Sequence, residues 1–261
     1  MKFPVKDIKS PNVDFDDDIG GLSYRVAELE SRVHYSWGPD VSVTTKLANP
    51  RYREAPLYLT PGTWDISAGF ESFNDGEHVT GAGYYTVLRS NGASPMWTIT
   101  NDRVVIRGVR FTDNGESVSR MISASSADYV TIDSCTFSFS TTSAAAIYLS
   151  DCDHVTIRNC TITYSGSGAS TGIYLLDCNN AMIENNRILG VDRGSSGIAI
   201  NLDSTGTGSA STRCNDCIVS GNHVSSSGSI RYNTSGNHLV GDSSVSGQAK
   251  LNNVSAAFVA Y

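Results

Sequence analysis

A short pattern of alternating apolar and polar residues recurs five times along the chain. Its first, third and eighth positions are apolar, and its fourth and seventh are polar. The five copies are Val104–Phe111, Val130–Phe137, Val155–Ile162, Ala181–Ile188 and Cys217–Val224. The first four start 26, 25 and 26 residues apart, and a Gly/Ser-rich insertion, Ser204–Arg213, delays the fifth. A period of two is typical of β-strands with one buried face.

Alignment of the copies places like residues in columns. The third positions are Ile106, Ile132, Ile157, Ile183 and Val219, and the eighth are Phe111, Phe137, Ile162, Ile188 and Val224. Between the two halves of the copies stand Gly108, Ser134, Asn159, Asn185 and Gly221, at a position where Gly and Asn tolerate a left-handed turn. Further apolar strands are expected at Met121–Ser123, Ala146–Leu149, Gly172–Leu176 and Gly197–Leu202. The pattern predicts a parallel β-helix whose coils stack at about 4.8 Å.

The six cysteines fall into the same columns. Cys135 and Cys160 share an inward column with Asn186 and Asn222, and Cys152, Cys178 and Cys214 share another. In-register neighbours would have parallel Cβ vectors at about 4.8 Å, beyond the distance that a disulfide prefers. We therefore expect six free, buried thiols and a hydrogen-bonded Asn ladder. Zinc at Cys214 and Cys217 is the alternative, but a single Cys-x2-Cys is weak evidence for it.

The stretch Pro56–Asn91 resembles the first coils of pectate-lyase-like proteins. Leu59–Trp64 (LTPGTW) is similar to their Leu-Pro-Pro-Gly strand, and Gly81–Leu88 (GAGYYTVL) to their Gly-x-Gly-x-x-Thr-x-Leu turn. With the repeats, the resemblance covers residues 56–240 and implies an all-β fold, a right-handed single-stranded parallel β-helix. It implies no single activity, because this fold carries lyases, hydrolases, epimerases and non-catalytic fibres.

The residues before the β-helix carry a different pattern. Residues 1–17 combine Pro, Lys and an acidic run and are expected to form an extended docking arm. Residues 18–36 predict a short helix, because Leu22, Val26, Leu29 and Val33 follow the spacing of a coiled-coil seam. Residues 37–55 are expected to be a linker and residues 241–261 a C-terminal cap.

This order of elements resembles phage tailspike and fibre proteins. The resemblance implies a homotrimer whose N-terminal arm docks to other virion proteins and whose body meets host surface polysaccharide. In the alternative interpretation, the helix only covers the first coil. The N-terminus has no apolar segment of the kind that a secretory signal peptide needs. We therefore expect synthesis in the host cytoplasm and a final location on the virion.

Composition and charge narrow the range of partners. The chain has 261 residues, of which 24 are Gly and 17% are charged, and a formal net charge of −7. Nucleic acid is an unexpected partner for such an acidic chain, because a duplex-binding surface needs clustered Lys and Arg. No apolar run approaches the roughly 20 residues of a membrane span, so membrane insertion is not expected.

Candidate catalytic residues are carboxylates at the turns. Asp113 and Glu116 share a loop, and Asp151 and Asp177 would lie at one corner of neighbouring coils. Two carboxylates facing one groove are the requirement of a glycosidase. The motifs Arg-x-Pro-x-x-Arg and Trp-Ile-Asp-His of pectate lyases are absent, as is a matching Asp pair of the polygalacturonase type, which argues against pectin cleavage. We expect no cofactor and no metal site.

Two outward columns complete the set of candidate sites. Tyr148 and Tyr174 share one column and are candidates for stacking against a sugar, although a purely structural aromatic pair would look the same. Another column alternates in charge through Arg107, Asp133, Arg158 and Glu184, which predicts a structural salt-bridge ladder.

These observations leave two main functional hypotheses. The first is a non-catalytic virion structural protein, a phage fibre, spike or decoration protein that attaches to host surface glycans. The alternative is a polysaccharide depolymerase, a hydrolase or lyase, on a phage tailspike. A secreted bacterial lyase is disfavoured because no signal peptide is visible.

Overall fold

The structure, a computed structural model, describes residues 35–37, 56–67, 69–71, 75–141, 144–190, 197–203, 214, 216–224, 229–233, 238–241, 244–245 and 251–252. The expected docking arm, residues 1–17, lies outside these described residues. So do the four seam positions of the expected helix, Leu22, Val26, Leu29 and Val33. Helix and trimer therefore remain predictions.

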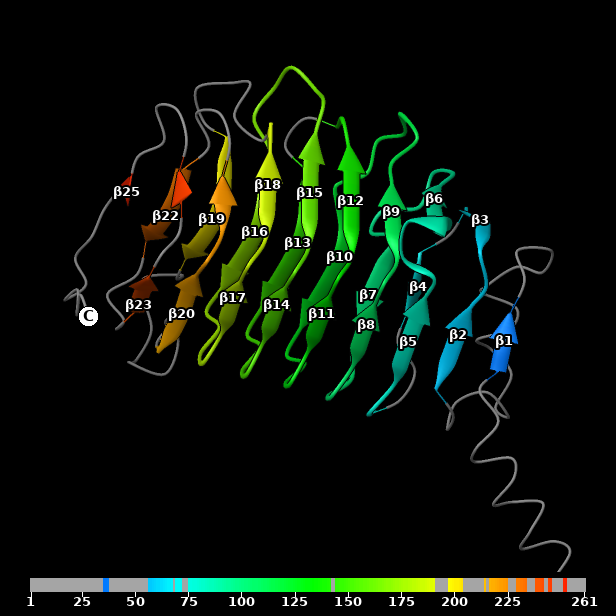
Figure 1. Cartoon of the computed structure of the whole chain (residues 1–261), viewed down its shortest axis with the longest axis horizontal. Helices are drawn as coiled ribbons and strands as arrows, with labels where there is room; N and C mark the ends of the chain where they lie inside the picture. The colour runs from blue at the N-terminus through cyan, green and yellow to red at the C-terminus, as the bar shows by residue number, and fades with distance from the viewer. Residues whose placement is uncertain are drawn as a thin grey trace, which may run out of the picture. The chain divides into compact units, whose positions relative to one another are not determined.

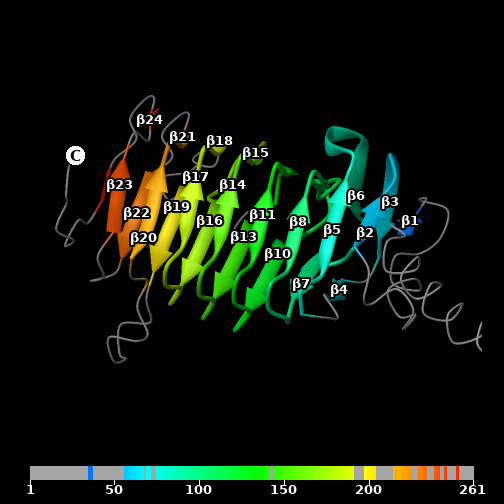
Figure 2. The same ribbon diagram turned by 60° about the horizontal axis from the view of Figure 1, so that its bottom comes forward.

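Short strands wind repeatedly through three parallel sheets, here named A, B and C (Figures 1 and 2). From β2 onward the chain visits A, B and C in turn, so each strand pairs with the strand three further along the chain. Every pairing is parallel, and neighbouring coils are in register, as in β11, which pairs with both β8 and β14, except for a shift between Ile198 and Ile200 where β19 pairs with β22. This is the predicted solenoid, in which one coil contributes one strand to each sheet.

The strands have the following bounds. Sheet A contains β1 (Tyr35–Trp37), β2 (Leu57–Leu59), β5 (His78–Gly81), β8 (Val105–Arg107), β11 (Thr131–Asp133), β14 (Thr156–Arg158), β17 (Met182–Glu184), β20 (Cys217–Ser220) and β23 (His238–Gly241). Sheet B contains β3 (Gly62–Ile66), β6 (Thr86–Ser90), β9 (Arg110–Thr112), β12 (Thr136–Phe139), β15 (Thr161–Tyr164), β18 (Arg187–Leu189), β21 (His223–Val224) and β24 (Ser244–Val245). Sheet C contains β4 (Phe70–Glu71), β7 (Trp97–Ile99), β10 (Arg120–Ser125), β13 (Ala145–Ser150), β16 (Thr171–Leu176), β19 (Ile198–Asp203), β22 (Ser229–Asn233) and β25 (Leu251–Asn252). The 3₁₀ turn η2 (Gly83–Tyr85) joins β5 to β6, and the described residues contain no α-helix.

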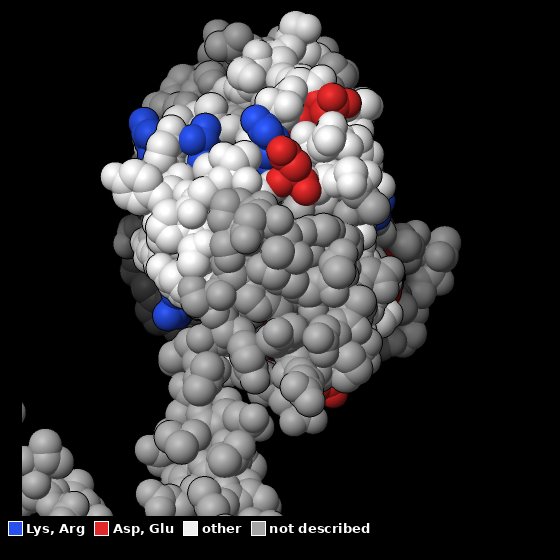
Figure 3. Space-filling view, turned by 90° about the vertical axis from the view of Figure 1, so that its right-hand side faces the viewer, with Lys and Arg blue, Asp and Glu red and all other residues white. Residues whose placement is uncertain are grey.

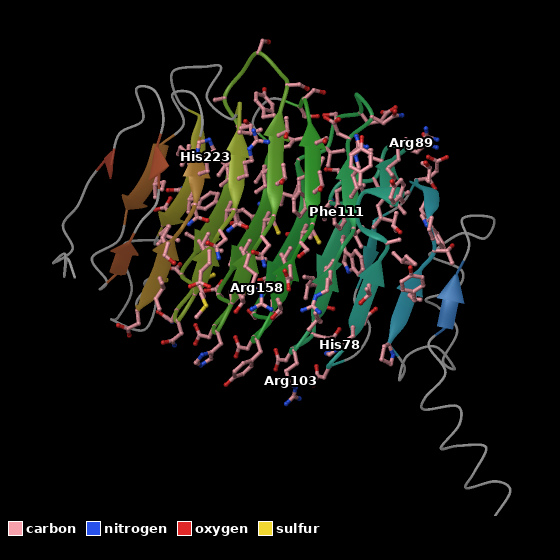
Figure 4. The ribbon with its side chains drawn as sticks, in the orientation of Figure 1. His78, Arg89, Arg103, Phe111, Arg158 and His223 are labelled. Atoms are coloured by element: carbon pink, nitrogen blue, oxygen red, sulfur yellow. The ribbon has the colours of Figure 1, made fainter. Side chains whose placement is uncertain are left out.

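The predicted columns are confirmed strand by strand. Ile132 pairs with Ile106 on one side and with Ile157 on the other, and the column continues to Ile183 and Val219. The second column runs in the same way through Phe111, Phe137, Ile162, Ile188 and Val224. All of these side chains are buried. The ring of Phe111, labelled in Figure 4, stacks on that of Phe137 with 5.0 Å between the centroids. The interior is therefore a set of stacked columns.

The bend between sheets A and B uses the left-handed conformation that the sequence predicted. Gly108, Ser134, Asn159, Asn185 and Gly221 have φ values of 62°, 55°, 55°, 55° and 62°. At Gly108 a side chain is also excluded by space, because an added Cβ would lie 2.9 Å from the carbonyl oxygen of Gly81. The corner between sheets C and A repeats the left-handed conformation at Asp151, His154, Asp177 and Asn180, where φ is 52° to 56°.

The predicted Asn ladder is present in the core. The Asn186 side chain donates to the carbonyl oxygen of Ile157 (3.0 Å) and to Oδ1 of Asn222 (3.0 Å), while its own Oδ1 accepts from the Cys160 backbone N–H (2.9 Å). Asn222 in turn donates to the Ile183 carbonyl (2.8 Å). Both amides are buried, so these bonds satisfy groups that have no access to water.

All six cysteines are free and buried, as predicted. Hydrogen bonding to the Cys135 thiol, together with burial, raises the pKa of Cys160 well above its ordinary value. Hydrogen bonding to Cys152 and burial raise the pKa of Cys178 in the same way. These two thiols therefore remain protonated, and they pack as small apolar side chains.

Strand pairing extends beyond the boundaries expected for the β-helix. β1 pairs with β2 through Tyr35 and Leu57, so sheet A already begins within the stretch expected to be helix end and linker. At the other end, β24 and β25 extend sheets B and C past residue 240. On the described part of the end where β1 lies, positive and negative side chains stand next to each other (Figure 3).

Two adjacent asparagines provide a stability test. We expect Asn186→Ala to lower the free energy of unfolding by about 3 kcal/mol, because it leaves buried backbone groups of neighbouring coils unpaired. Asn185→Gly is the matched control: it replaces a left-handed residue by the one that adopts this conformation most easily, and stability should change by less than about 1 kcal/mol. Urea unfolding followed by circular dichroism measures both, and equal losses would contradict the ladder's role.

Candidate functional site

The outer face of sheet C carries an open groove. The groove has a volume of about 330 Å³ and crosses β10, β13 and β16, which lie side by side in Figure 2. It is lined by Pro95, Ser119, Arg120, Ala144, Ala145, Tyr148, Thr171 and Tyr174. Most of these side chains are apolar or uncharged, and two are aromatic. Both tyrosines that the sequence singled out for sugar contact therefore lie in the same groove.

Alternation along the strands brings the tyrosines outward. In β13 the neighbours of Tyr148, Ile147 and Leu149, are buried, and Tyr148 itself is half-buried on the outer face. Tyr174 is its register partner on β16. The two ring centroids are 5.1 Å apart and the rings are nearly perpendicular, at 80°. This edge-to-face arrangement is the one that aromatic pairs favour.

Two charged residues extend the tyrosine pair along the axis of the solenoid. The guanidinium carbon of Arg120 lies 3.6 Å from the centroid of the Tyr148 ring, which is a close cation–π contact. Tyr174 donates a hydrogen bond from its hydroxyl to Oδ2 of Asp203 (2.8 Å). Arg120, Tyr148, Tyr174 and Asp203 come from β10, β13, β16 and β19, so they form a row with one residue per coil. We call this set the groove row.

Sequence reasoning missed Arg120 as part of this site. The signal was present in the register, which pairs Arg120 with Ala145, three residues before Tyr148. Only a long side chain can cross from that position to the ring on the next coil, and a column read residue by residue does not show such a diagonal contact. Asp203, at the end of β19, was likewise not among the predicted site residues.

Asp113, the first catalytic candidate, uses its carboxylate to hold the loop of the next coil. The side chain is buried, and its Oδ2 accepts hydrogen bonds from the backbone N–H groups of Ser140 (2.6 Å) and Thr141 (3.2 Å) and from both of their hydroxyls. Oδ1 accepts from the Gly115 N–H (3.3 Å). A carboxylate surrounded by donors in this way supports the loop of the next coil, which is a structural role. Glu116, in the same loop, is exposed.

Asp151 and Asp177 lie on neighbouring coils as expected, because the residues before them, Ser150 and Leu176, are register partners. Their environments differ: Asp151 is exposed, whereas Asp177 is buried. Both occupy the left-handed corner conformation, which Asp tolerates better than most residues. The corner geometry therefore gives a structural reason for Asp at both positions. None of the four candidate carboxylates lines the groove.

The same corner also carries a ladder of acidic side chains. Asp128 accepts a hydrogen bond from the Asp153 backbone N–H (2.8 Å), and Asp102 accepts one from the Asp128 N–H (2.8 Å). Asp153 continues the ladder by accepting from the backbone and side-chain amides of Asn179 (3.1 and 2.9 Å). Among the described residues, no group of three or more His, Cys, Asp or Glu side chains could hold a metal ion.

The charge ladder on sheet A is present in its first three members. Asp133 lies between Arg107 (2.9 Å to its Oδ2) and Arg158 (3.1 Å), and its Oδ1 accepts from Ser134 and Asn159. Burial alone would raise the pKa of Asp133, but the hydrogen bonds from Asn159, Ser134 and Arg158 outweigh it and lower the pKa. The expected fourth member differs: Glu184 accepts from the Ser220 hydroxyl (3.3 Å), because Nε and Nη2 of Arg158 both face Asp133.

Comparison with known families assigns the fold. The profile of the family described as "Right handed beta helix region" matches residues 71–163 and, in a second alignment, residues 96–257, which together exceed half of the chain. The chain therefore belongs to the right-handed β-helix family. A comparison with curated proteins gave no match. No helix among the described residues is long and apolar enough to cross a membrane.

Two solved structures illustrate the similarity of fold. The catalytic domain of a GH87 α-1,3-glucanase in complex with nigerose is 14% identical, with a TM-score of 0.45 over 82% of this chain and 45% of that one. The Dettilon tailspike protein is 12% identical, with a TM-score of 0.30 over 82% of this chain and 56% of that one. The chain thus spans about half the length of these proteins. At such low identities the comparison concerns the fold alone.

Asp133 gives a pH-dependent prediction. The pKa of Asp133 in the folded chain lies below its ordinary value of 3.8, so its ion pairs stabilise the fold above that pH and the stabilisation is lost as the pH falls through the folded pKa. Asp133→Asn should therefore lower the free energy of unfolding by about 1–3 kcal/mol at neutral pH. Unfolding curves recorded from about pH 7 to about pH 2 should show the gap to the wild type closing in acid.

Exposed Glu116 provides the control for this experiment. Glu116→Gln should leave stability nearly unchanged near neutral pH, because surface charges contribute little. A deficit in the Asp133 variant that stays constant through the acid range would contradict the assigned ion pairs.

Proposed function

We propose that this protein is a non-catalytic, glycan-binding β-helix of a phage fibre, spike or decoration protein, which attaches the virion to host surface polysaccharide through the groove on sheet C. The observation that carries the proposal is the pair of half-buried tyrosines in an open groove with a cation stacked on one ring. Aromatic rings offer apolar surface to the C–H faces of sugars, and their hydroxyls hydrogen-bond to sugar hydroxyls.

The direction of the groove row supports a polymeric ligand. Its four residues come from four successive coils, which stack at about 4.8 Å, close to the length of one pyranose ring. An extended polysaccharide lying along the solenoid axis would place successive sugars against successive coils. The strands below are rigidly paired, so the groove is largely preformed, and little conformational entropy is lost on binding.

The non-catalytic part of the proposal rests on the carboxylates. Glycoside hydrolysis needs two of them on either side of one scissile bond. The four candidates, Asp113, Glu116, Asp151 and Asp177, are absent from the groove lining, and Asp113 is occupied by five hydrogen bonds. The groove as described therefore favours retention of a glycan over its cleavage.

The virion part of the proposal rests on the sequence before residue 36. The acidic arm, the seam Leu22–Val33 and the β-helix follow the order of phage tailspike and fibre proteins. In this proposal three copies associate through the seam, and the arm docks to other virion proteins. Three parallel β-helices would display three grooves, and multivalent contact with a repeating polysaccharide strengthens weak individual binding.

Single substitutions in the tyrosine pair test glycan binding. Tyr148→Ala and Tyr174→Ala should each weaken binding to the recognised polysaccharide about tenfold, the loss expected for one aromatic contact. Tyr85→Ala is the control, because Tyr85 is 73% exposed on η2 and lies outside the groove. Surface plasmon resonance on an array of bacterial surface polysaccharides gives the affinities. Equal affinities for the wild type and the three variants would contradict the proposal. So would release of oligosaccharides by the wild type that stops in Asp151→Asn or Glu116→Gln.

The oligomeric state tests the seam. Sedimentation of the whole chain should give three times the chain mass of 27.9 kDa. A variant with Asp at both Leu22 and Leu29 should sediment as one chain, because charges in an apolar seam prevent its association. Serine substitutions at the exposed residues Tyr84 and Tyr85 should leave the trimer intact. A wild-type monomer at micromolar concentration would argue against the trimer.

A further inference from the structure

The groove carries a positive charge that has no carboxylate partner in the described part of the chain. Arg120 is the single charged residue in the groove lining. Of the other arginines on the outer faces of the sheets, Arg89 pairs with Asp65, and Arg107 and Arg158 share Asp133, whereas Arg110 of sheet B stacks on the Tyr84 ring at 4.3 Å. Among the described residues no carboxylate pairs with Arg120. The groove thus presents an uncompensated positive charge, although the whole chain has a net charge of −7.

The way Arg120 is held leaves its strongest donors available. Its guanidinium rests on the Tyr148 ring, with 3.6 Å between the guanidinium carbon and the ring centroid. When a guanidinium stacks face to face on a ring, its five N–H donors lie in its own plane and are not used by that contact. One donor, on Nη1, makes a long bond of 3.4 Å to the Ser123 hydroxyl. The remaining donors match the geometry of a carboxylate, which accepts two parallel bonds.

The other end of the groove row has the opposite character. Tyr174 points its hydroxyl at the Asp203 carboxylate, 2.8 Å away, and this bond orients the ring. A negative group on the ligand would be attracted by Arg120, which lies three coils away from Asp203. The row therefore has a polarity along the solenoid axis. A charged polysaccharide would bind with its anionic substituent at the β10 side.

We infer that the polysaccharide recognised by the groove row is anionic, and that Arg120 binds its acidic substituent, a sugar carboxylate or sulfate. This inference rests on the proposed function and specifies its ligand. A neutral glycan would cover the guanidinium without supplying an acceptor of equal strength, and a buried donor without a partner is costly. Arg120 thus selects against neutral glycans as well as for acidic ones.

Chemical reduction of the carboxyl groups provides a matched neutral ligand. A uronic-acid polysaccharide from the bacterial array is compared with the same polymer after its carboxylates have been converted to alcohols, and sulfated polymers form a second arm. The whole chain should bind the acidic form about tenfold to a hundredfold more tightly than the reduced form, the gain expected from charge-assisted hydrogen bonds. Raising the salt concentration should reduce this preference.

Substitution of Arg120 separates ligand recognition from support of the Tyr148 ring. Arg120→Gln should remove the preference for the acidic form by weakening its binding, while affinity for the reduced form stays the same or rises. Arg120→Lys should keep part of the preference, since an ammonium retains the charge but loses the planar fork. Arg187→Gln, on the outer face of sheet B, is the matched control and should bind like the wild type.

The outcomes distinguish this inference from the proposed function. Binding that depends on the tyrosines but is equally tight for the acidic and the reduced polysaccharide would overturn the inference alone. So would an Arg120→Gln variant whose affinity falls equally for the two forms. Binding only to neutral polysaccharides on the array would also overturn the inference alone. Failure to bind any polysaccharide on the array would overturn both proposals. A preference for acidic forms that is lost only in the Arg120 variants is the result expected.

Discussion

In-register stacking of one coil on the next is the constraint on which this molecule depends. Each strand has its partner one coil away, so every backbone hydrogen bond of the sheets is also a contact between coils. A slip by one residue would turn the Ile and Phe columns outward and the polar columns inward. The core columns, the Asn ladder and the corner aspartates each oppose such a slip. They do so with different interactions, which makes the register robust.

The corners between the strands require particular residue types in the sequence. A bend between flat strands needs residues in the left-handed conformation, and the chain supplies mostly Gly, Asn, Ser or Asp at these points, with Arg103, Tyr129 and His154 as exceptions. At the corner between sheets C and A, Asp151 and Asp177 follow the same requirement. The carboxylates of Asp128 and Asp153 at this corner accept backbone hydrogen bonds from the next coil. Acidic residues at these turns therefore have a structural explanation before any chemical one.

The outer faces are free of the packing constraint, and function can vary there. Sheet A uses its outer column for an ion-pair ladder in which Arg107 and Arg158 are both bound to Asp133. Sheet C uses the equivalent positions for aromatic rings and a cation that no carboxylate of the described residues neutralises. A ladder satisfied within the protein stabilises it, whereas a row with an unmatched charge is suited to an external ligand. That contrast is the physical basis for placing the binding site on sheet C.

The sequence alone determined the solenoid, because a period of about 26 residues with matching Ile, Phe and Asn columns admits few other arrangements. It also determined the left-handed corners, the free thiols and the outward tyrosine column, all of which depend on register. Only the tertiary structure showed that Arg120 reaches the Tyr148 ring and that Asp113 is enclosed by donors from the next coil. Both contacts run diagonally between coils through side chains and loops. A one-dimensional pattern records which residues share a column, and it contains no information on how far a side chain reaches from its own column into another.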